Sequence, residues 1–279
     1  KPIFGCAALK NDRSPMTDAT DNRPINIQPK LINQVALVTG GAGGLGAAIC
    51  DALAAEGASV IVGFNQSAEA AHALANRLSS GLHSQHHRAM AVSVTDSAGL
   101  ANLANDIGQQ YGQLNMLVNC AGTTRFVAHS DLDGLDDALI DEILAVNVRG
   151  PFATARALRS LLVRSGAGLI VNISSIAASS AMGSNIMYCA SKAALDNMTK
   201  SLARALAPAI RVVSVSPGLV DTEFVKSLDP KWRDEQVMRT PLARLAAPAE
   251  VAQAVVATAT HFRFSTGTVF AVDGGRGLA

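Results

Sequence analysis

From residue 31 onward, short aliphatic runs alternate with longer segments of helical periodicity, and this alternation leaves few architectures open to the chain. Buried strands that are aliphatic throughout, each followed by a helix, are typical of a parallel sheet covered on both faces. Right-handed crossovers between such strands predict an α/β fold, a doubly wound parallel sheet of about seven strands with helices on both faces. The expected strands are 35–39, 59–63, 88–92, 116–119, 168–173, 211–215 and 268–272, and the expected helices are 44–56, 67–80, 96–111, 136–148, 151–165, 188–207 and 249–260.

Composition narrows the class of protein further. The chain has 279 residues, a formal net charge of +1 and a hydrophobic fraction of 49%, which excludes an intrinsically disordered protein. A nearly neutral chain has little excess positive charge to bind the phosphates of a nucleic acid, so we do not expect nucleic acid as a partner. The chain has no run of 18 apolar residues, so we do not expect a membrane as a partner either. The four cysteines show no CxxC spacing, so we expect no disulfide framework, no zinc site and a reducing cytoplasm as location.

The first 30 residues differ from the rest of the chain. They are polar, contain several prolines and follow neither the strand nor the helix period. We expect residues 1–30 to form an N-terminal extension without active-site residues, or else an arm that packs on a partner subunit. Residues 31–279 show no linker and are expected to form a single domain.

A glycine cluster follows the first expected strand and opens the first expected helix. Glycines allow a backbone to approach a pyrophosphate closely, and a helix N-terminus supplies free N–H groups and positive potential. The position of the cluster in the first strand–helix turn favours a Rossmann-like, NAD(P)-binding domain, although tight turns use glycine for structural reasons alone. The candidate cofactor-binding residues are Thr39, Gly40, Gly43, Gly44, Leu45 and Gly46.

A tyrosine and a lysine lie four residues apart on the longest expected helix, at Tyr188 and Lys192. Residues four apart share a helix face, and a nearby cation lowers the pKa of a phenol towards the range useful for acid–base chemistry. Ser174 and Ser175 follow an aliphatic strand upstream, at the sheet edge where ligands bind in such folds. Since neighbouring strand residues face opposite ways, we expect one serine to point into the site. Without this context, the pair could be a plain helix surface and the serines could cap the strand.

Taken together, these motifs resemble the short-chain dehydrogenases/reductases in their single-domain branch, across residues 35–275. The turn at 39–46 is similar to the cofactor turn of that family, and 117–122 is similar to its Asn-Asn-Ala-Gly segment, with Cys120 in place of the second Asn. Ser175, Tyr188 and Lys192 have the family's spacings. Further similar segments are 146–150, 217–222 and 272–275. The resemblance adds as cofactor-binding residues Asn119, Ala121, Gly122, Pro217, Gly218, Val220, Thr222, Tyr188 and Lys192.

The resemblance implies an NAD(P)-dependent oxidoreductase that transfers hydride between nicotinamide and a carbonyl or secondary alcohol. Tyr188 would be the acid–base group, Ser175 would bind the substrate oxygen, and Lys192 would lower the tyrosine pKa and hold ribose hydroxyls. Asn147 would anchor a water in a proton relay. We expect an NADPH-dependent ketone or 3-oxoacyl-type reductase. The alternatives are an NAD-dependent polyol or hydroxysteroid dehydrogenase and a non-catalytic cofactor-sensing regulator. A homotetramer or homodimer, paired through helices within 153–162 and 201–206, is also implied.

The second expected strand leads into Asn65, Gln66 and Ser67 rather than into the acid that selects NAD(H). Residues 31–76 also contain no Lys or Arg to pair with a 2′-phosphate. Because neutral donors at a helix N-terminus can hold a phosphate, we favour NADP(H), with NAD(H) possible. Ser93 and Val213 replace an Asp and an Asn that are common in the family, and Ser93 bears on the adenine pocket.

Two further segments have expected roles. The histidines at 83, 86 and 87 lack metal-ligand spacing, so we expect a solvated loop there and no metal site. Residues 222–240, which contain Trp232, are expected to cover the substrate. Arg125, Phe126 and Met182 are expected to line the substrate side of the site.

Overall fold

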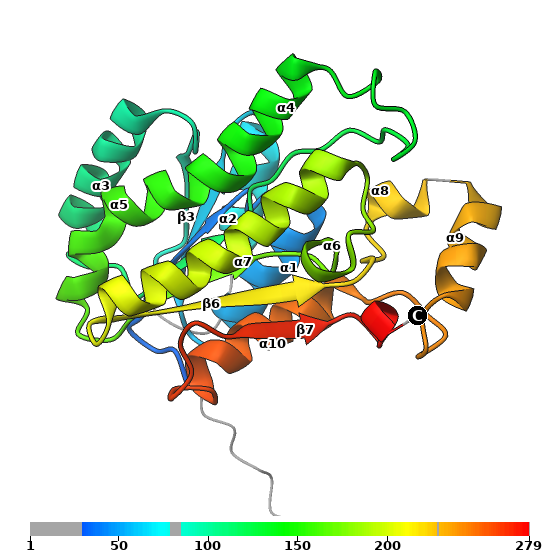
Figure 1. The fold of residues 1–279 in the computed structure, drawn as a ribbon. Coiled ribbons are helices and arrows are strands. Elements are labelled where there is room, and N and C mark those ends of the chain that lie inside the picture. The colour runs from blue at the N-terminus through cyan, green and yellow to red at the C-terminus, as the bar shows by residue number, and fades with distance from the viewer. Residues whose placement is uncertain (1–29, 79–84, 228, 279) are drawn as a thin grey trace, which may run out of the picture.

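The computed structural model describes residues 30–78, 85–227 and 229–278. Its seven strands form one parallel sheet in the order β3-β2-β1-β4-β5-β6-β7 (Figure 1). The order reverses between β1 and β4, so the chain runs outward from the middle of the sheet in both directions. The strands are β1 Val35–Thr39, β2 Ser59–Phe64, β3 Arg88–Ala91, β4 Met116–Asn119, β5 Gly168–Ile173, β6 Ile210–Pro217 and β7 Val269–Val272.

Helices cover both faces of this sheet, which confirms the predicted doubly wound α/β fold. One apolar cluster joins the sheet to α1, α2 and α10, and a second joins it to α3, α5 and α7. Successive residues of β1 alternate between the clusters, Ala36 and Val38 in the first, Val35 and Leu37 in the second. The helices are α1 Gly44–Ala55, α2 Ala68–Leu78, α3 Ser97–Tyr111, α4 Asp137–Leu144, α5 Gly150–Arg164, α6 Ala177–Ser180, α7 Ile186–Leu206, α8 Glu223–Lys226, α9 Pro230–Met238 and α10 Pro248–Thr260.

The helix expected over 136–148 changes its winding before it ends. It is α-helical to Leu144, continues as a π-helical turn over Ala145–Arg149 and runs on into α5. Pro151 has no N–H, so the carbonyl of Asn147 lacks the donor that a regular α-helix would supply four residues later. The wider turn accommodates this gap, and such turns are frequent at functional sites.

A chain of buried polar side chains crosses three strands of the sheet. The Thr154 hydroxyl donates to Asn119 Oδ1 at 2.7 Å, and Asn119 Nδ2 donates to Asn172 Oδ1 at 2.8 Å. Asn172 Nδ2 in turn donates to Thr199 Oγ1 at 2.8 Å, and Thr199 Oγ1 shares a hydrogen bond of 2.9 Å with Ser214 Oγ. Both polar atoms of the Asn119 side chain are therefore hydrogen-bonded within the protein.

His87 corrects the expectation of a solvated histidine loop. Its side chain is buried, and its Nδ1 accepts a hydrogen bond of 3.1 Å from the backbone N–H of Val60, while Nε2 contacts Gln85 Oε1 at 3.0 Å. Burial lowers the pKa of His87 and so favours the neutral ring, whose Nδ1 can accept the hydrogen bond from β2. His86 is exposed as expected, and His83 lies outside the described residues.

The described part of the chain also bears on the expected absences. Within it, Cys50, Cys120 and Cys189 are free thiols. Among these same residues, no group of three or more His, Cys, Asp or Glu side chains could hold a metal ion. No helix of the described ranges is long and apolar enough to cross a membrane. The expected extension over 1–30 lies outside them, apart from Lys30.

Candidate active site

The glycine turn between β1 and α1 forms one wall of the candidate site. Gly40 has a φ of +65° and lies directly against the backbone of Ala121, and a Cβ on Gly46 would collide with the carbonyl oxygen of Gly40. Helix α1 begins at Gly44, and its N-cap Gly43 has no side chain to cap the first N–H groups. Exposed Gly43 and Gly44 therefore leave an uncapped helix start, which suits a pyrophosphate.

Thr39 joins the end of β1 to the loop after β4. Its side chain is 1% exposed, and its Oγ1 accepts hydrogen bonds of 3.1 Å from the backbone N–H groups of both Cys120 and Ala121. These bonds tie the end of β1 to the loop after β4. The Thr39 side chain thus positions the loop after β4 beside the glycine turn.

The segment after β6 faces the glycine turn from the other side. The N–H of Gly218 donates to the carbonyl of Val272 at 3.0 Å, and Val220 is buried and bridges to Ala246. A Cβ on Gly44 would lie 3.4 Å from the Thr222 side chain, so Thr222 stands over the start of α1. Residues 217–222 and 40–46, far apart in the sequence, therefore border the same space.

Tyr188 and Ser175 meet at the carboxyl end of β5. Burial raises the pKa of the Tyr188 phenol, and a hydrogen bond from Ser175 partly opposes that shift. Ser175 Oγ also accepts from the N–H of Ala177 at 3.2 Å, which orients it. Ser174 is buried and its hydroxyl has no partner among the described residues, so Ser175 is the serine that reaches the tyrosine.

Lys192 lies beneath the tyrosine on the same face of α7. Its Nζ donates to the carbonyl of Ile173 at 2.9 Å and stands 5.7 Å from the centre of the Tyr188 ring. Burial lowers the pKa of Lys192 to about 8, while the Cys120 thiol and the Asp196 carboxylate act in the opposite direction. Burial is the largest influence on the pKa of Tyr188, and the Lys192 ammonium donates its hydrogen bond to the carbonyl of Ile173.

Asn147 projects from the π-helical turn towards the same place. Its Oδ1 accepts from the N–H of Thr123 at 2.9 Å, and its Nδ2 donates to the carbonyl of Thr123 at 3.0 Å and to Ser191 Oγ at 3.2 Å. A Cβ on Gly122 would lie 3.4 Å from Asn147 Oδ1 and 3.9 Å from Lys192 Nζ. Gly122 therefore keeps open a space that borders both side chains.

The end of β2 lies apart from the catalytic residues and beside the glycine turn. The N–H of Gly41 donates to the carbonyl of Gly63 at 2.8 Å, which joins the two strand ends. Asn65, Gln66 and Ser67 follow, and all three are exposed without a side-chain hydrogen bond to any described residue. Their donors are free for a ligand. Ser93 is half-buried and shares a hydrogen bond of 3.2 Å with the Thr95 hydroxyl.

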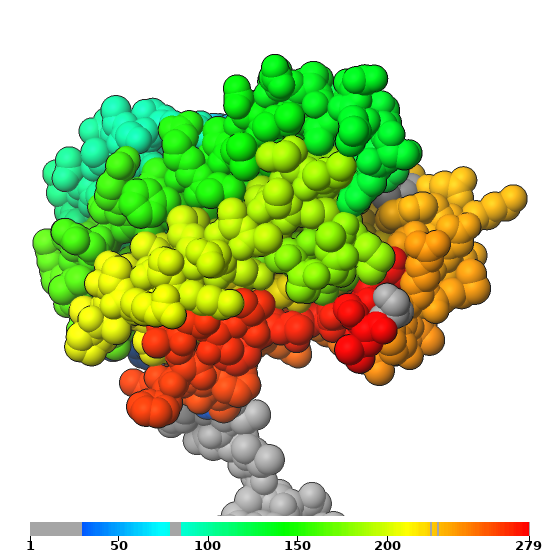
Figure 2. All heavy atoms as spheres, in the orientation of Figure 1, coloured from blue at the N-terminus to red at the C-terminus, as the bar shows by residue number. Residues whose placement is uncertain are grey.

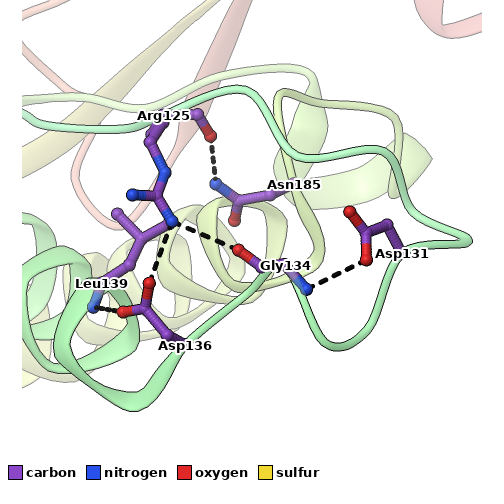
Figure 3. Close-up of polar contacts among 6 residues, drawn as sticks. All are labelled: Arg125, Asp131, Gly134, Asp136, Leu139 and Asn185. Atoms are coloured by element: carbon purple, nitrogen blue, oxygen red, sulfur yellow. Dashed lines mark hydrogen bonds and ion pairs between the residues drawn. The ribbon is translucent and has the colours of Figure 1, made fainter.

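Two of the expected substrate-side residues, Arg125 and Phe126, lie in the loop after β4, and the third, Met182, lies between α6 and α7. Arg125 donates to the carbonyl of Gly134 at 3.2 Å and pairs with the Asp136 carboxylate at 3.0 Å, as Figure 3 shows. Asp136 also accepts from the N–H of Leu139 and so caps α4. Phe126 and Met182 are exposed, with 75% and 47% of their surface accessible. Arg125 thus fixes the loop after β4, while the apolar side chains of Phe126 and Met182 are exposed.

Helices α8 and α9 form the segment expected to cover the substrate. In Figure 2 this segment, coloured orange, lies at one edge of the molecule beside the red C-terminal residues. Arg233 on α9 pairs with Asp221 at 2.7 Å, and Arg276 donates to both the carbonyl and Oε1 of Gln236. Trp232 is half-buried on the same helix. The segment therefore has fixed anchors at Asp221 and at the C-terminus.

These observations allow a test of whether the site suits a dinucleotide. The uncapped start of α1 suits a diphosphate, the space beside Gly122 adjoins Lys192 and Asn147, and free neutral donors stand at the end of β2. The residues present therefore fit the group. Four further expected residues adjoin this space because their neighbours in the chain border it; they are Leu45, Ala121, Pro217 and Gly218. The structure shows no side-chain contact that distinguishes them.

Sequence reasoning missed several residues of the site. Asn185 caps α7 and accepts from the N–H of Tyr188 at 2.6 Å, and Ser191 donates to the carbonyl of Tyr188 at 2.7 Å. An asparagine three residues before a helical tyrosine is a recognisable N-cap signal. Nothing in the sequence signals that Thr123 would bond to Asn147, because that contact depends on the path of a loop.

Comparisons with known proteins agree with this geometry. Residues 34–233 match the family model described as short chain dehydrogenase. The chain is 37% identical to a protein of Streptomyces violaceoruber named as ketoacyl reductase 2 of the granaticin polyketide synthase, over 88% of this chain and 96% of that one. It is 36% identical to a D-threitol dehydrogenase of Mycolicibacterium smegmatis, over 88% and 94%.

A further relative and a solved structure extend the comparison. The chain is 34% identical to a 3-oxoacyl-acyl-carrier-protein reductase of Thermotoga maritima, over 88% of this chain and 98% of that one. It superposes with a TM-score of 0.82 on a gluconate 5-dehydrogenase from Burkholderia cenocepacia in complex with NADP and tartrate. That match has 27% sequence identity and covers 90% of this chain and 98% of the other.

Proposed function

The chain belongs to the short-chain dehydrogenase family and is an NAD(P)-dependent oxidoreductase acting on CH–OH groups, and from this premise we propose that it is an NADPH-dependent reductase of ketones or 3-oxoacyl-type substrates. The observation that carries the proposal is the meeting of Ser175, Tyr188 and Lys192 at the carboxyl end of β5. The relatives named as ketoacyl and 3-oxoacyl reductases support the direction.

In the proposed reaction, Tyr188 donates its phenolic proton to the oxygen of the substrate carbonyl, and Ser175 donates a hydrogen bond to the same oxygen. Because burial raises the pKa of Tyr188, the phenol holds its proton at neutral pH until the substrate oxygen becomes basic. A bound nicotinamide coenzyme supplies the hydride. Lys192 then stabilises the tyrosinate, and its own lowered pKa allows it to pass a proton on.

The proton must finally be replaced from solvent, and Asn147 is suited to that step. Its side chain is fully engaged with Thr123 and Ser191, which leaves the backbone carbonyl as the group able to hold a water. That carbonyl is the one that lacks an α-helical donor because of Pro151. The proposed relay therefore runs from Tyr188 through Lys192 to water held at Asn147.

The coenzyme would be held by three groups of residues. The turn residues Gly40, Gly43, Gly44, Leu45 and Gly46 would hold the diphosphate, with Thr39 fixing their position. Ala121, Gly122, Pro217, Gly218, Val220 and Thr222 would border the nicotinamide half, together with Tyr188 and Lys192, and Asn119 would support them from within the sheet. Asn65, Gln66 and Ser67 would contact the adenosine ribose.

We favour NADP(H) over NAD(H) because the exposed side chains at the end of β2 are neutral donors without a carboxylate among them. Fluorescence titration should give a lower Kd for NADPH than for NADH. Asn65→Asp should reverse that order, since a carboxylate accepts from a ribose 2′-hydroxyl and repels a 2′-phosphate. Asn76→Asp, the same change on an exposed position of α2, is the control and should leave the order unchanged. Tighter NADH binding by the wild type would refute the preference.

Tyr188→Phe tests the acid–base role. It removes only the hydroxyl, so turnover should be lost while NADPH binding stays within about two-fold of wild type. Tyr111, the second of the two tyrosines in the chain, donates to the carbonyl of His86 away from the site, so Tyr111→Phe is a matched control. Substantial turnover by Tyr188→Phe would remove the tyrosine from the mechanism.

A second candidate is NAD-dependent oxidation of a secondary alcohol. The relatives named as D-threitol dehydrogenase and as 3-alpha-(or 20-beta)-hydroxysteroid dehydrogenase, each 36% identical, favour it. The two candidates differ in coenzyme and in direction. Following nicotinamide absorbance with NADPH plus ketones, and with NAD plus polyols or hydroxysteroids, separates them.

The assembly and location of the enzyme belong to the proposal as well. Phe152 and Val163 on α5 are large apolar side chains that are 44% and 47% exposed, which supports a homodimer or homotetramer paired through this helix. Residues 31–279 would act as one catalytic domain in the cytoplasm, preceded by the extension over 1–30. Light scattering during gel filtration should give the mass of a dimer or tetramer, and a monomer would refute the assembly.

A further inference from the structure

We infer that Asn185 and Ser191 are positioning residues for Tyr188, because they close a ring of hydrogen bonds that holds the backbone of this tyrosine from both sides. The inference rests on the proposed role of Tyr188. Neither residue touches the reacting atoms, so both would act by placing the phenol.

The first side of the ring holds the N–H of Tyr188. Asn185 Oδ1 accepts from it at 2.6 Å, and Asn185 Nδ2 donates to the carbonyl of Arg125 at 2.8 Å and to Thr124 Oγ1 at 3.2 Å. The asparagine is 1% exposed, and both of its amide hydrogens have acceptors. Figure 3 shows its amide turned towards Arg125. One side chain thus fixes the start of α7 to the loop after β4.

The second side holds the carbonyl of Tyr188. Ser191 Oγ donates to it at 2.7 Å and accepts from Asn147 Nδ2 at 3.2 Å. Asn147 is bound through its other amide contacts to both backbone groups of Thr123. Ser191 is fully buried, so no water competes for these bonds.

The loop residues 123–125, which we call the strap, connect the two sides. The strap is bound by Asn147 at Thr123 and by Asn185 at Thr124 and Arg125. It directly follows Gly122, which borders Lys192. The ring therefore runs from Tyr188 through Asn185, the strap, Asn147 and Ser191 back to Tyr188, and it couples the phenol to the loop that faces the substrate.

A displacement of a reacting group by about 1 Å can lower a rate by about 100-fold, so the ring can matter to catalysis without touching substrate. Asn185→Ser separates the two duties of the asparagine. Serine is a good N-cap and keeps the bond to Tyr188, but it lacks the donors that reach the strap. We expect its kcat to fall by at least about ten-fold while the Kd for NADPH stays within about two-fold.

Two further variants make the test specific. Asn115→Ser is the matched control. Asn115 Oδ1 accepts from the N–H of Val35 at the opposite end of the sheet, so this variant should leave kcat unchanged. Ser191→Ala should lower kcat as Asn185→Ser does. Because a ring is opened by one break, the double variant should lose less activity than the product of the single losses.

Kinetics of these variants with NADPH and the best ketone, together with their melting temperatures, decide the question. A kcat within two-fold of wild type for Asn185→Ser overturns the inference, and so does an equal loss in Asn115→Ser, which would show a general effect of stability. A loss that appears in the Kd for NADPH rather than in kcat overturns it as well. If Asn185→Ser does not fold, Ser191→Ala carries the same test. An active Tyr188→Phe would instead refute the proposed function.

Discussion

The polar chain across β4, β5 and β6 can be tested by replacing its middle member, Asn172, with leucine. Leucine has a similar size, so the change removes polarity with little change in volume. It takes the acceptor away from Asn119 Nδ2 and the donor away from Thr199 Oγ1, both of which are buried. Neither strand pairing nor the active-site residues are altered directly.

The magnitude follows from what each partner loses. A buried amide hydrogen of Asn119 left without an acceptor costs about 1–3 kcal/mol. Thr199 keeps its bonds to the carbonyl of Leu195 and to Ser214, so its lost bond adds only about 0.5–1.5 kcal/mol. The free energy of unfolding should therefore fall by about 2–4 kcal/mol, which corresponds to a fall in Tm of roughly 4–8 °C for a domain of this size.

Differential scanning calorimetry of Asn172→Leu measures this change directly. The double variant Asn119→Leu, Asn172→Leu is the informative companion, because it removes the amide that the single change leaves unpaired. Its loss of stability should be smaller than the sum of the two single losses. A Tm for Asn172→Leu within about 1 °C of wild type would refute the assignment of these bonds as stabilising.

Three further predictions concern single residues. Gly46→Ala should abolish NADPH binding and lower Tm, because its Cβ would meet the Gly40 carbonyl; normal binding in a titration would contradict this. Burial lowers the pKa of His87 below the value of 6.5 for an exposed ring, so the unfolded chain takes up this proton at a higher pH than the folded protein does. The free energy of unfolding should therefore decrease as the pH drops below 6.5, by at most about 1.4 kcal/mol per pH unit. Urea unfolding at pH 7.5 and 5.5 should show that the free energy of unfolding changes less with pH in His87→Gln than in the wild type. An equal change in both proteins would refute the claim. Arg211→Met should lower Tm, since Arg211 donates to the carbonyls of Thr258, Phe262 and Ser265; an unchanged melting curve would contradict that role.

The strands were predictable from the sequence because a buried parallel strand is aliphatic on both faces. The expected runs at 35–39, 116–119 and 168–173 coincide with β1, β4 and β5. The glycine turn was predictable for a related reason, since a backbone that passes so close to another backbone at Gly40 and Gly46 excludes a side chain.

The polar contacts were not predictable in the same way. A buried threonine or asparagine looks the same in sequence whether it binds a ligand or another strand, so the hydrogen bonds that Thr39 and Asn119 make within the protein were not expected. His87 was assigned to solvent because its polarity was visible and its partner, a backbone N–H of β2, was not. The π-helical turn over Ala145–Arg149 lies just before Pro151, whose missing N–H is visible in the sequence, whereas the change in winding is not.

The place of α10 in the fold has a consequence for how the protein is made. Helix α10 packs directly on α1, and both belong to the apolar cluster behind the glycine turn. Helix α1 is therefore synthesised well before the helix that packs on it, and that contact can form only when residues 248–260 have been added. The packing behind the coenzyme turn is thus completed only after α10 has been made, so NADPH would meet a fully packed turn only from that point on.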